Sequence, residues 1–425
     1  MPRYLYILSF LLLCLPSSFA QQISVGSDNI GHISVAVNDD ETALPVLILG
    51  SSDRLTVEFD DLTTMYRRFT YTISHQTPDW QPTTTLFESQ YLSLAPDDSP
   101  IEGYEQSSIT LTGYTHYQII IGGTDAQAIK PLLAGNYLLS VYTEGEESEE
   151  EDEEGTKPVF TVQFMVCEPR ATLSVQPTVD TDIDYHKAHQ QLNVTVSLPA
   201  LPIINHAEEL RLVCQQNRSP YYTIVAPAPT YIAGTTLKWE HCRALIFPGG
   251  NEYRVFGIPS TRVPGLHVDR IRIDDDFYTA TRIPDYPYRD YYYDEDQNGQ
   301  CEIFTNDSDN PQLDADYILT RFVLTMPERV GSEIFIDGQW PEAGLPTRMT
   351  YHADTESYES VVFLKQGYYS YRYLSLEHVA GRDVVNNIDG NYFQTENEYT
   401  SYLYYRPQGS RYWQLVAVSS CNYKP

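Results

Sequence analysis

The sequence lacks an excess of positive charge. Its 425 residues include 27 Lys and Arg against 58 Asp and Glu, so the formal net charge at pH 7 is −31. Such an acidic surface repels phosphate backbones and anionic lipid headgroups. Nucleic acid is therefore not expected as a partner, and a basic surface on another protein is the electrostatically favoured one.

Long apolar runs are missing after the N-terminus. No later stretch approaches the roughly 20 apolar residues that a helix needs to cross a bilayer. The N-terminus itself carries Arg3, an apolar run over Tyr4–Leu15 and the small-x-small pattern Ser18-Phe19-Ala20, which is typical of a secretory signal peptide. We therefore predict a signal peptide over residues 1–20 and an exported chain that does not span a membrane.

Closely spaced cysteines are also missing. The five that follow the predicted signal peptide are far apart in the sequence: Cys167, Cys214, Cys242, Cys301 and Cys421. This odd number at wide spacing is neither a dense disulfide framework nor a zinc site, which needs closely paired ligands. Cys214 and Cys242 can form one bridge inside a domain or stay reduced, since wide pairs are only sometimes within bonding geometry.

Catalytic motifs are absent as well. Neither a Gly-x-Ser-x-Gly elbow nor a His-Glu-x-x-His pair occurs. His75, Asp79 and His116 can be imagined as a hydrolytic or metal-binding group, but nothing in their spacing forces them together. We predict that the protein is not an enzyme and that it holds no metal or cofactor.

Helical periodicity is nearly absent, whereas strand signals occur throughout. β-branched and aromatic residues alternate with polar ones in short runs, and clusters of Gly, Pro, Asn and Asp separate the runs. Clear examples are residues 69–73, 109–112, 137–142, 160–164 and 192–196. This pattern predicts an all-β protein built from two to three consecutive β-sandwich, immunoglobulin-like domains.

The strand runs suggest three successive domains. The first extends over residues 21–168 and closes with a hairpin whose arms are Tyr137–Thr143 and Val159–Phe164. The loop between these arms, Glu144–Lys157, is strongly acidic, and mutual repulsion is expected to keep it extended and hydrated. A middle β domain is predicted over residues 169–312, and a C-terminal sandwich over residues 313–425.

The segment from Asp294 to Gly299 allows two interpretations. Its oxygen-bearing side chains at alternate positions begin like a calcium loop, but the twelfth position is Thr305, where a helix–loop–helix calcium site needs a bidentate Glu. Asn298-Gly299 is also a strong signal for a tight turn because both residues tolerate positive φ. The turn is the favoured interpretation, and calcium binding over Asp294–Asn298 stays open.

Tyrosine is unusually abundant, with 35 copies in the chain. Five of them fall within eight residues: Tyr286, Tyr288, Tyr291, Tyr292 and Tyr293. Tyr combines a large apolar face with a hydroxyl at small entropic cost, which suits contact surfaces, but it also suits packing across strands. We take Tyr288, Tyr291, Tyr292 and Tyr293 as candidate partner-contact residues, whereas Tyr368–Tyr373 is expected to pack internally.

The order of several motifs carries a family resemblance. In the first predicted domain these are Tyr71-Thr72-Ile73-Ser74-His75, Asp79-Trp80-Gln81-Pro82, Gln90-Tyr91-Leu92, Tyr114-Thr115-His116-Tyr117 and Ala134-Gly135-Asn136-Tyr137-Leu138-Leu139-Ser140-Val141. Further landmarks are Asp184-Tyr185-His186-Lys187-Ala188, Gln215-Gln216-Asn217-Arg218, Phe247-Pro248-Gly249-Gly250-Asn251-Glu252-Tyr253-Arg254 and Lys365-Gln366-Gly367-Tyr368-Tyr369. Taken together, this series resembles the type IX secretion plug family of Bacteroidetes-type bacteria.

The resemblance implies a role in secretion. It implies a periplasmic protein, peripheral to the outer membrane, that binds the type IX translocon barrel and closes its periplasmic opening while no cargo passes. The sequence departs from the family pattern at Gln76-Thr77-Pro78 and in the acidic loop after Glu144, which puts contacts near that loop in doubt.

Carbohydrate binding is the alternative. Phe335-Ile336-Asp337-Gly338-Gln339-Trp340 and the later Gly367-Tyr368-Tyr369-Ser370-Tyr371 are similar to immunoglobulin-like domains attached to starch-active enzymes. Aromatic faces that are exposed can stack on sugars, although a Trp near a turn can equally belong to the core of a sandwich.

Overall fold

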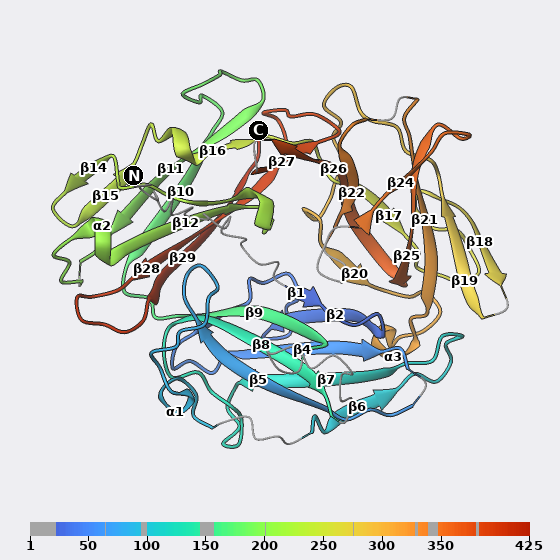
Figure 1. Ribbon diagram of the computed structural model, residues 1–425, viewed down its shortest axis with the longest axis horizontal. Helices are drawn as coiled ribbons and strands as arrows, with labels where there is room; N and C mark the ends of the chain where they lie inside the picture. Colours follow the sequence, from blue (N-terminus) through green and yellow to red (C-terminus); the bar gives the residue numbers. More distant parts are fainter. Residues whose placement is uncertain are drawn as a thin grey trace, which may run out of the picture.

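The computed structural model describes residues 23–63, 65–94, 100–144, 157–199, 201–274, 276–327, 330–338, 347–379 and 382–425. These residues form three β-sandwiches (Figure 1), so the all-β prediction is confirmed. The predicted signal peptide, most of the acidic loop and Trp340 lie outside the described residues. In the described part of the chain, no helix has the length and apolar character required to cross a membrane.

The first sandwich contains the N-terminal strands. One sheet has the order β2-β4-β7-β6, and the facing sheet places β8 between β5 and β9, with β1 and β3 both paired to β9. The bounds are β1 (Ile23–Val25), β2 (Ile30–Val37), β3 (Val46–Ile48), β4 (Arg54–Asp61), β5 (Phe69–Gln76), α1 (Glu88–Tyr91), β6 (Gly103–Gln106), β7 (Thr115–Gly122), β8 (Gly135–Thr143) and β9 (Phe160–Cys167).

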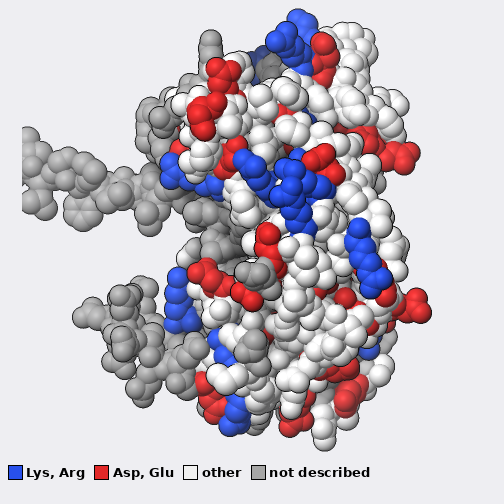
Figure 2. Space-filling model, turned by 90° about the vertical axis from the view of Figure 1, so that its right-hand side faces the viewer, with Lys and Arg blue, Asp and Glu red and all other residues white. Residues whose placement is uncertain are grey.

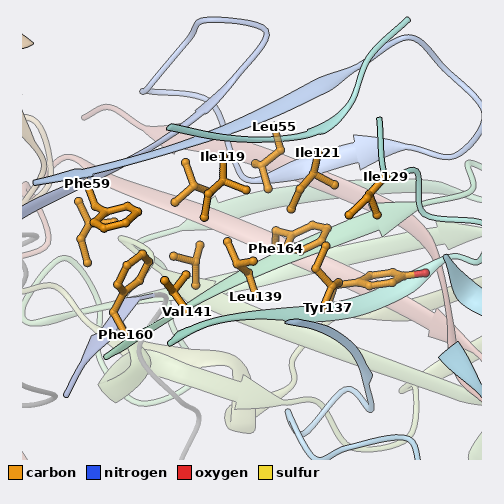
Figure 3. Packing of buried hydrophobic residues seen from close by; sticks show 14 of the residues in the cluster. Leu55, Phe59, Ile119, Ile121, Ile129, Tyr137, Leu139, Val141, Phe160 and Phe164 are labelled. Carbon is orange, nitrogen blue, oxygen red and sulfur yellow. The ribbon is translucent and has the colours of Figure 1, made fainter. Parts of the chain in front are cut away.

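Alternating side chains build the core of this sandwich. In β7, Ile119 and Ile121 are buried, whereas Ile120 between them is 40% exposed, as the two-residue period of a strand requires. Figure 3 shows these residues facing the aromatic and aliphatic side chains of β8 and β9 across the sandwich. The ring of Phe59 stacks on Tyr117 with centroids 5.1 Å apart. In β7 the apolar alternation in the sequence therefore specifies which face is inside, whereas β9 is buried on both faces.

The second sandwich combines strands from two distant parts of the chain. One sheet has the order β10-β11-β15-β14 with β16 paired to β11, and the other has the order β13-β12-β28-β29. The bounds are β10 (Thr172–Thr178), β11 (His189–Ser197), α2 (His206–Glu209), β12 (Leu210–Gln216), η1 (Pro220–Tyr222), β13 (Thr223–Val225), β14 (Tyr231–Ala233), β15 (Thr236–Trp239), η2 (Arg243–Leu245), β16 (Ile246–Pro248), β28 (Asn397–Tyr405) and β29 (Gln414–Tyr423).

The third sandwich is formed by the intervening chain. One sheet has the order β17-β26-β22-β23 with β20 and β27 also paired to β26, and the other has the order β18-β19-β21-β25-β24. The bounds are β17 (Arg254–Gly257), β18 (Val268–Asp274), β19 (Phe277–Arg282), β20 (Cys301–Ile303), α3 (Pro311–Asp314), β21 (Tyr317–Thr325), β22 (Glu333–Asp337), β23 (Thr347–Arg348), β24 (Thr350–His352), β25 (Ser357–Lys365), β26 (Gly367–Val379) and β27 (Arg382–Asn387).

This grouping of strands differs from the division drawn from the sequence. The predicted boundary after residue 312 falls inside the third sandwich, where β19 pairs with β21 in parallel and Tyr278 lies opposite Ile318. At the C-terminus, β28 returns to the second sandwich and pairs with β12, so that Leu212 lies opposite Leu403. The third sandwich is thus inserted into the second, which strand signals cannot reveal because they are local and the pairing is not.

The structure tests two local predictions, the internal packing of the Tyr368–Tyr373 run and the bonding of Cys214 with Cys242. Tyr369, Tyr371 and Tyr373 of β26 are buried, so the expectation of internal packing is confirmed for these three, whereas Tyr368 is 36% exposed. Cys214 and Cys242 are both buried in the second sandwich and are not bonded to each other. The Cys214 Sγ instead accepts a hydrogen bond from Ser401 Oγ at 3.2 Å, and burial raises the pKa of this thiol to about 12.

Candidate functional site

The tyrosine segment, residues 286–293, is an irregular stretch attached to the third sandwich. Two of its backbone N–H groups hold it in place: Tyr288 N donates to Asp389 Oδ1 at 2.8 Å, and Tyr292 N donates to Asn251 Oδ1 at 3.1 Å. These bonds give the segment a defined course although it belongs to no strand, so its side chains point in fixed directions.

Tyr288 is a packing residue. Its ring lies under the guanidinium of Arg254, with Cζ 3.8 Å from the ring centroid. Arg254 is itself buried and binds Asp389 at 2.8 Å and Asp285 at 3.2 Å. On the outer side, Tyr292 stacks on Tyr288 with centroids 4.7 Å apart and is 48% exposed. Tyr288 thus supports the more exposed ring of Tyr292.

Tyr291 is also held from within. Its hydroxyl donates to Glu252 Oε1 at 2.6 Å, and the same carboxylate accepts the backbone N–H of Glu396 at 3.1 Å. Burial raises the pKa of Glu252 to about 7. Tyr291 therefore links the segment to the strand that begins at Asn397 and has little freedom to reach a partner.

The exposed members of the segment are Tyr286, Tyr292 and Tyr293, at 63%, 48% and 57%. Sequence reasoning named Tyr292 and Tyr293 as contact candidates but omitted Tyr286, whose neighbour Ile283 is also exposed. The candidate set thus divides into two supporting residues, Tyr288 and Tyr291, and two exposed ones. The sequence held no signal for this division because all four tyrosines have the same local context.

The tyrosine segment begins far from the contact between the third and first sandwiches. Strand β21 begins at Tyr317, which contacts the first sandwich, and reaches Leu324, which forms a bridge with Asp285. Seven residue steps at about 3.3 Å each correspond to roughly 23 Å. Asp285, the residue before Tyr286, is therefore distant from the contact with the first sandwich.

The segment from Asp294 to Gly299 contains the expected tight turn. Asn298 and Gly299 have φ values of 51° and 89°, and Gln300 N donates to Gln297 O at 3.1 Å. Both oxygens of Asp296 accept backbone N–H groups, from Tyr253 and Asn298 at 2.6 Å each, and burial raises the pKa of this carboxyl to about 6. Among the described residues, no group of three or more His, Cys, Asp or Glu side chains is placed to hold a metal ion.

His75, Asp79 and His116 do not form one constellation. The His75 Nδ1 lies 3.0 Å from Thr83 Oγ1, and burial lowers the pKa of His75 to about 4. Asp79 pairs with Arg211 of the second sandwich, and His116 Nδ1 lies 2.8 Å from Asp60 Oδ1. Each of the three has its own partner, and the contacts of Asp79 and His116 are structural ones at domain boundaries.

A charged cluster joins the first and third sandwiches. Lys365 Nζ lies 2.6 Å from Asp60 Oδ2, and the two side chains are 2% and 1% exposed. Tyr317 Oη donates to the same carboxylate oxygen at 2.6 Å and accepts the backbone N–H of His32 at 2.8 Å. Burial alone would raise the pKa of Asp60, but Lys365 and His116 outweigh it and hold that pKa below its usual value.

The boundary between the first and third sandwiches, which we call the first–third contact, contains a second anion, Asp316. The carboxylate of Asp316 accepts the backbone N–H groups of Leu111 at 2.5 Å and Thr112 at 3.0 Å. Tyr114 Oη donates to Ala315 O at 3.0 Å. Every anion of this contact thus has a specific donor, as buried charge requires.

A cavity lies where all three sandwiches meet. Its volume is about 130 Å³, and its lining includes Ile33 of the first sandwich, Arg218 of the second and Asp337 of the third. Arg218 donates to Thr42 O at 2.6 Å and pairs with Glu398 at 3.3 Å. Arg218 is therefore already engaged in a contact between the first and second sandwiches.

The surface charge is not uniform despite the negative total. Figure 2 shows the face on the side of β18 and β19, where Lys and Arg side chains gather near the middle and Asp and Glu side chains lie around them. Arg321 of β21, the strand next to β19, pairs with Glu359 at 2.5 Å. This side of the molecule therefore presents a mixture of charges to a partner.

Comparisons with known proteins add two findings. Residues 30–168 match the family model of the type 9 secretion system plug protein 1st domain. Over 95% of its length, the chain is similar to a hypothetical protein from Parabacteroides merdae ATCC 43184, known from a crystal structure at 2.30 Å resolution. The two are 29% identical, all of that chain is covered, and the TM-score is 0.87. No curated protein matches.

The two comparisons indicate both a shared fold and an association with a secretion system. The match with the solved structure shows that the arrangement of three sandwiches is shared with a protein of clearly related sequence. The family match includes β2 to β9, almost the whole first sandwich, and associates the chain with type IX secretion. Residues 30–168, which form most of the first sandwich, therefore belong to the type 9 secretion system plug protein 1st domain family.

Proposed function

We propose that this protein is a periplasmic plug subunit that binds the outer-membrane translocon barrel of the type IX secretion system and occludes its periplasmic opening. The observation that carries the proposal is the family match over residues 30–168. The series of motifs from Asp184 to Tyr369 that resembles the same family supports the proposal for most of the remaining chain. In this proposal the protein transforms no substrate and acts through its shape.

Steric occlusion is the mechanism. A translocon channel is too wide for a single side chain to close, whereas three β-sandwiches in mutual contact occupy a far larger space (Figure 1). Affinity for the barrel then comes from a protein interface of standard or larger size, with aromatic anchors near its centre and a polar rim.

The tyrosine segment is the docking surface that we propose. Tyr286, Tyr292 and Tyr293 are exposed on a segment that backbone hydrogen bonds hold in place. Aromatic rings that are already ordered lose little entropy on binding, which favours them as anchors.

The test is affinity purification of the tagged protein from outer membrane solubilised in detergent. Recovery of a very large β-barrel protein as the main partner is expected, and its absence would count against the plug assignment. A permeability assay of the outer membrane in cells adds an independent measurement, because loss of a plug should let normally excluded solutes cross it.

Paired variants test the docking surface. Tyr292→Ala combined with Tyr293→Ala is expected to reduce barrel recovery at least tenfold. The matched control is Tyr231→Ala in the second sandwich, which removes a tyrosine that is 55% exposed. Equal recovery with both variants would refute the tyrosine segment as the docking surface while leaving the plug assignment in place.

A further inference from the structure

The contact between the first and second sandwiches is continuous through one sheet. Strand β29 pairs in parallel with β9, where Leu415 lies opposite Cys167 and Glu168 N donates to Leu415 O at 2.9 Å. A separate buried apolar cluster covers this joint, formed by Met165, Cys167, Val213, Tyr402, Tyr404 and Leu415. Tyr404 Oη also donates to Asn136 Oδ1 of the first sandwich at 2.8 Å. Separation of these two sandwiches would expose a core and break a sheet.

The contact between the second and third sandwiches is fixed by the insertion. The chain enters the third sandwich after β16 and leaves it before β28, and these two crossings are bonded to each other through Tyr392 N and Gly250 O at 2.8 Å. Arg372 of β26 donates to Ser219 Oγ at 3.4 Å, and its guanidinium lies 5.1 Å from the ring of Tyr222. Two bonded crossings resist the rotation that a single linker would allow.

The first–third contact completes a closed ring of three sandwiches. With it, each sandwich contacts both of the others, so a swing of any one of them must break two boundaries at once. The cost at this boundary is high, because it separates the Asp60 and Lys365 charges that are 1% and 2% exposed. A hinge needs a boundary that opens cheaply, and all three boundaries described above are either buried and charged or continuous through main-chain bonds.

We infer that the three sandwiches move as one rigid body and that occlusion, which rests on the proposed function, ends only when the whole protein undocks. Opening by a swing of one domain is excluded by the closed ring of contacts. The interface with the partner must therefore be the weakest boundary in the assembly, weaker than any boundary inside this chain.

Neither Asp60 nor His32 makes the first–third contact a switch near neutral pH. Asp60 faces Lys365, Tyr317 and His116, and the charged or titratable groups around these are His32, Glu58, Tyr114, Asp314 and Asp316. A carboxyl whose pKa is lowered in the folded state stabilises the fold at any pH above its ordinary pKa. It loses this effect only as the pH falls through the lowered pKa. Burial and Lys365 also lower the pKa of His32 to about 4, so it stays neutral. Neither Asp60 nor His32 therefore changes its charge between pH 5 and 8.

Three amides report directly on opening of the ring. The N–H groups of His32, Leu111 and Thr112 donate to side chains of the third sandwich. Hydrogen exchange on the purified wild-type protein, with residue-level fragmentation in the mass spectrometer, should find them protected to within about tenfold of Leu139 in the core strand β8. Exchange a hundredfold faster than at Leu139 would overturn the inference, because it would reveal opening without global unfolding.

Variants make the test specific. Lys365→Met should raise exchange at the three amides at least tenfold, whereas Lys238→Met, which breaks an exposed Lys–Glu pair, should not. If Lys365→Met does not fold, Tyr317→Phe removes one bond of the same contact and should raise exchange at His32. Unchanged exchange in every first–third variant would overturn the inference. These measurements need no barrel, so failure to recover a barrel would refute the plug assignment and leave the rigidity result standing.

Discussion

The first–third contact and the tyrosine segment use the same residue types for opposite purposes. In the contact, Tyr317 is buried and its hydroxyl binds Asp60. In the segment, Tyr292 and Tyr293 keep about half of their surface in solvent. The difference teaches that neither tyrosine content nor acidity identifies a partner surface in this protein. What distinguishes the two regions is whether a second part of the chain supplies the hydrogen-bond partners.

The strongest way to break this comparison is to remove the cation of the buried contact. Lys365→Met leaves the Asp60 carboxylate without its charge partner at a site that is 1% exposed. The expected loss is about 3–5 kcal/mol of unfolding free energy, measured by urea denaturation. The exposed control Lys238→Met should lose less than about 1 kcal/mol. A loss below about 1 kcal/mol for Lys365→Met would mean that the contact contributes little to stability.

Tyr317→Phe tests the hydrogen bonds without removing a formal charge. It deletes the hydroxyl that donates to Asp60 and accepts from His32 N, and leaves a buried N–H without a partner. We expect a loss of about 1–3 kcal/mol in the same denaturation experiment. Tyr293→Phe is the control in the exposed region and should be neutral, so equal effects of the two changes would remove the distinction between the regions.

Glu252→Gln tests the anchored part of the tyrosine segment through the pH dependence of stability, to which the exposed tyrosines should not contribute. Because burial raises the pKa of Glu252 to about 7, its protonated form stabilises the fold at low pH, and this effect is lost as the pH rises through about 7. The glutamine variant should therefore lose less stability between pH 5 and 8 than the wild type, by about 1 kcal/mol after allowance for solvent screening. Melting temperatures at both pH values measure this, and parallel curves would contradict it.

The exposed tyrosines should show the smallest effect on stability. Tyr292→Ala and Tyr293→Ala are expected to change the unfolding free energy by no more than about 0.5 kcal/mol each, because their rings have half of their surface in solvent. Thermal unfolding provides the measurement. A loss above about 2 kcal/mol for either would show that these rings stabilise the fold, and would weaken the case for them as contacts to a partner.

Local patterns in the sequence were sufficient for several features. Alternation predicted strands at residues 137–142 and 160–164, which are β8 and β9, and Asn298-Gly299 predicted a tight turn. The run at 109–112, also predicted as a strand, forms none and lies between β6 and β7. The expectation that Tyr368–Tyr373 packs internally also holds for Tyr369, Tyr371 and Tyr373. Each of these features depends on residues a few positions apart, so the physical cause is contained in the segment itself.

Other features depended on residues far apart in the chain. Nothing near Asp60 indicated that Lys365, 305 positions away, would neutralise it. The candidate tyrosines illustrate the same limit, because Tyr288 and Tyr291 are held by Arg254 and Glu252, whereas Tyr292 and Tyr293 are not. The free Cys214 and Cys242 are a third case, since the spacing of two cysteines does not determine whether their side chains meet.

The sequence by itself determined the class of structure, the direction in which a strand such as β7 presents its apolar face, and the resemblance to a secretion family. Strand periodicity and turn residues act over distances of a few residues, and a single sequence records them fully. Only the tertiary structure decided that the C-terminal strands complete the second sandwich and that a buried ion pair closes the ring of three domains. Such pairings are selected by the free energy of the whole packed chain, in which distant strands compete for the same edges and the same buried charges.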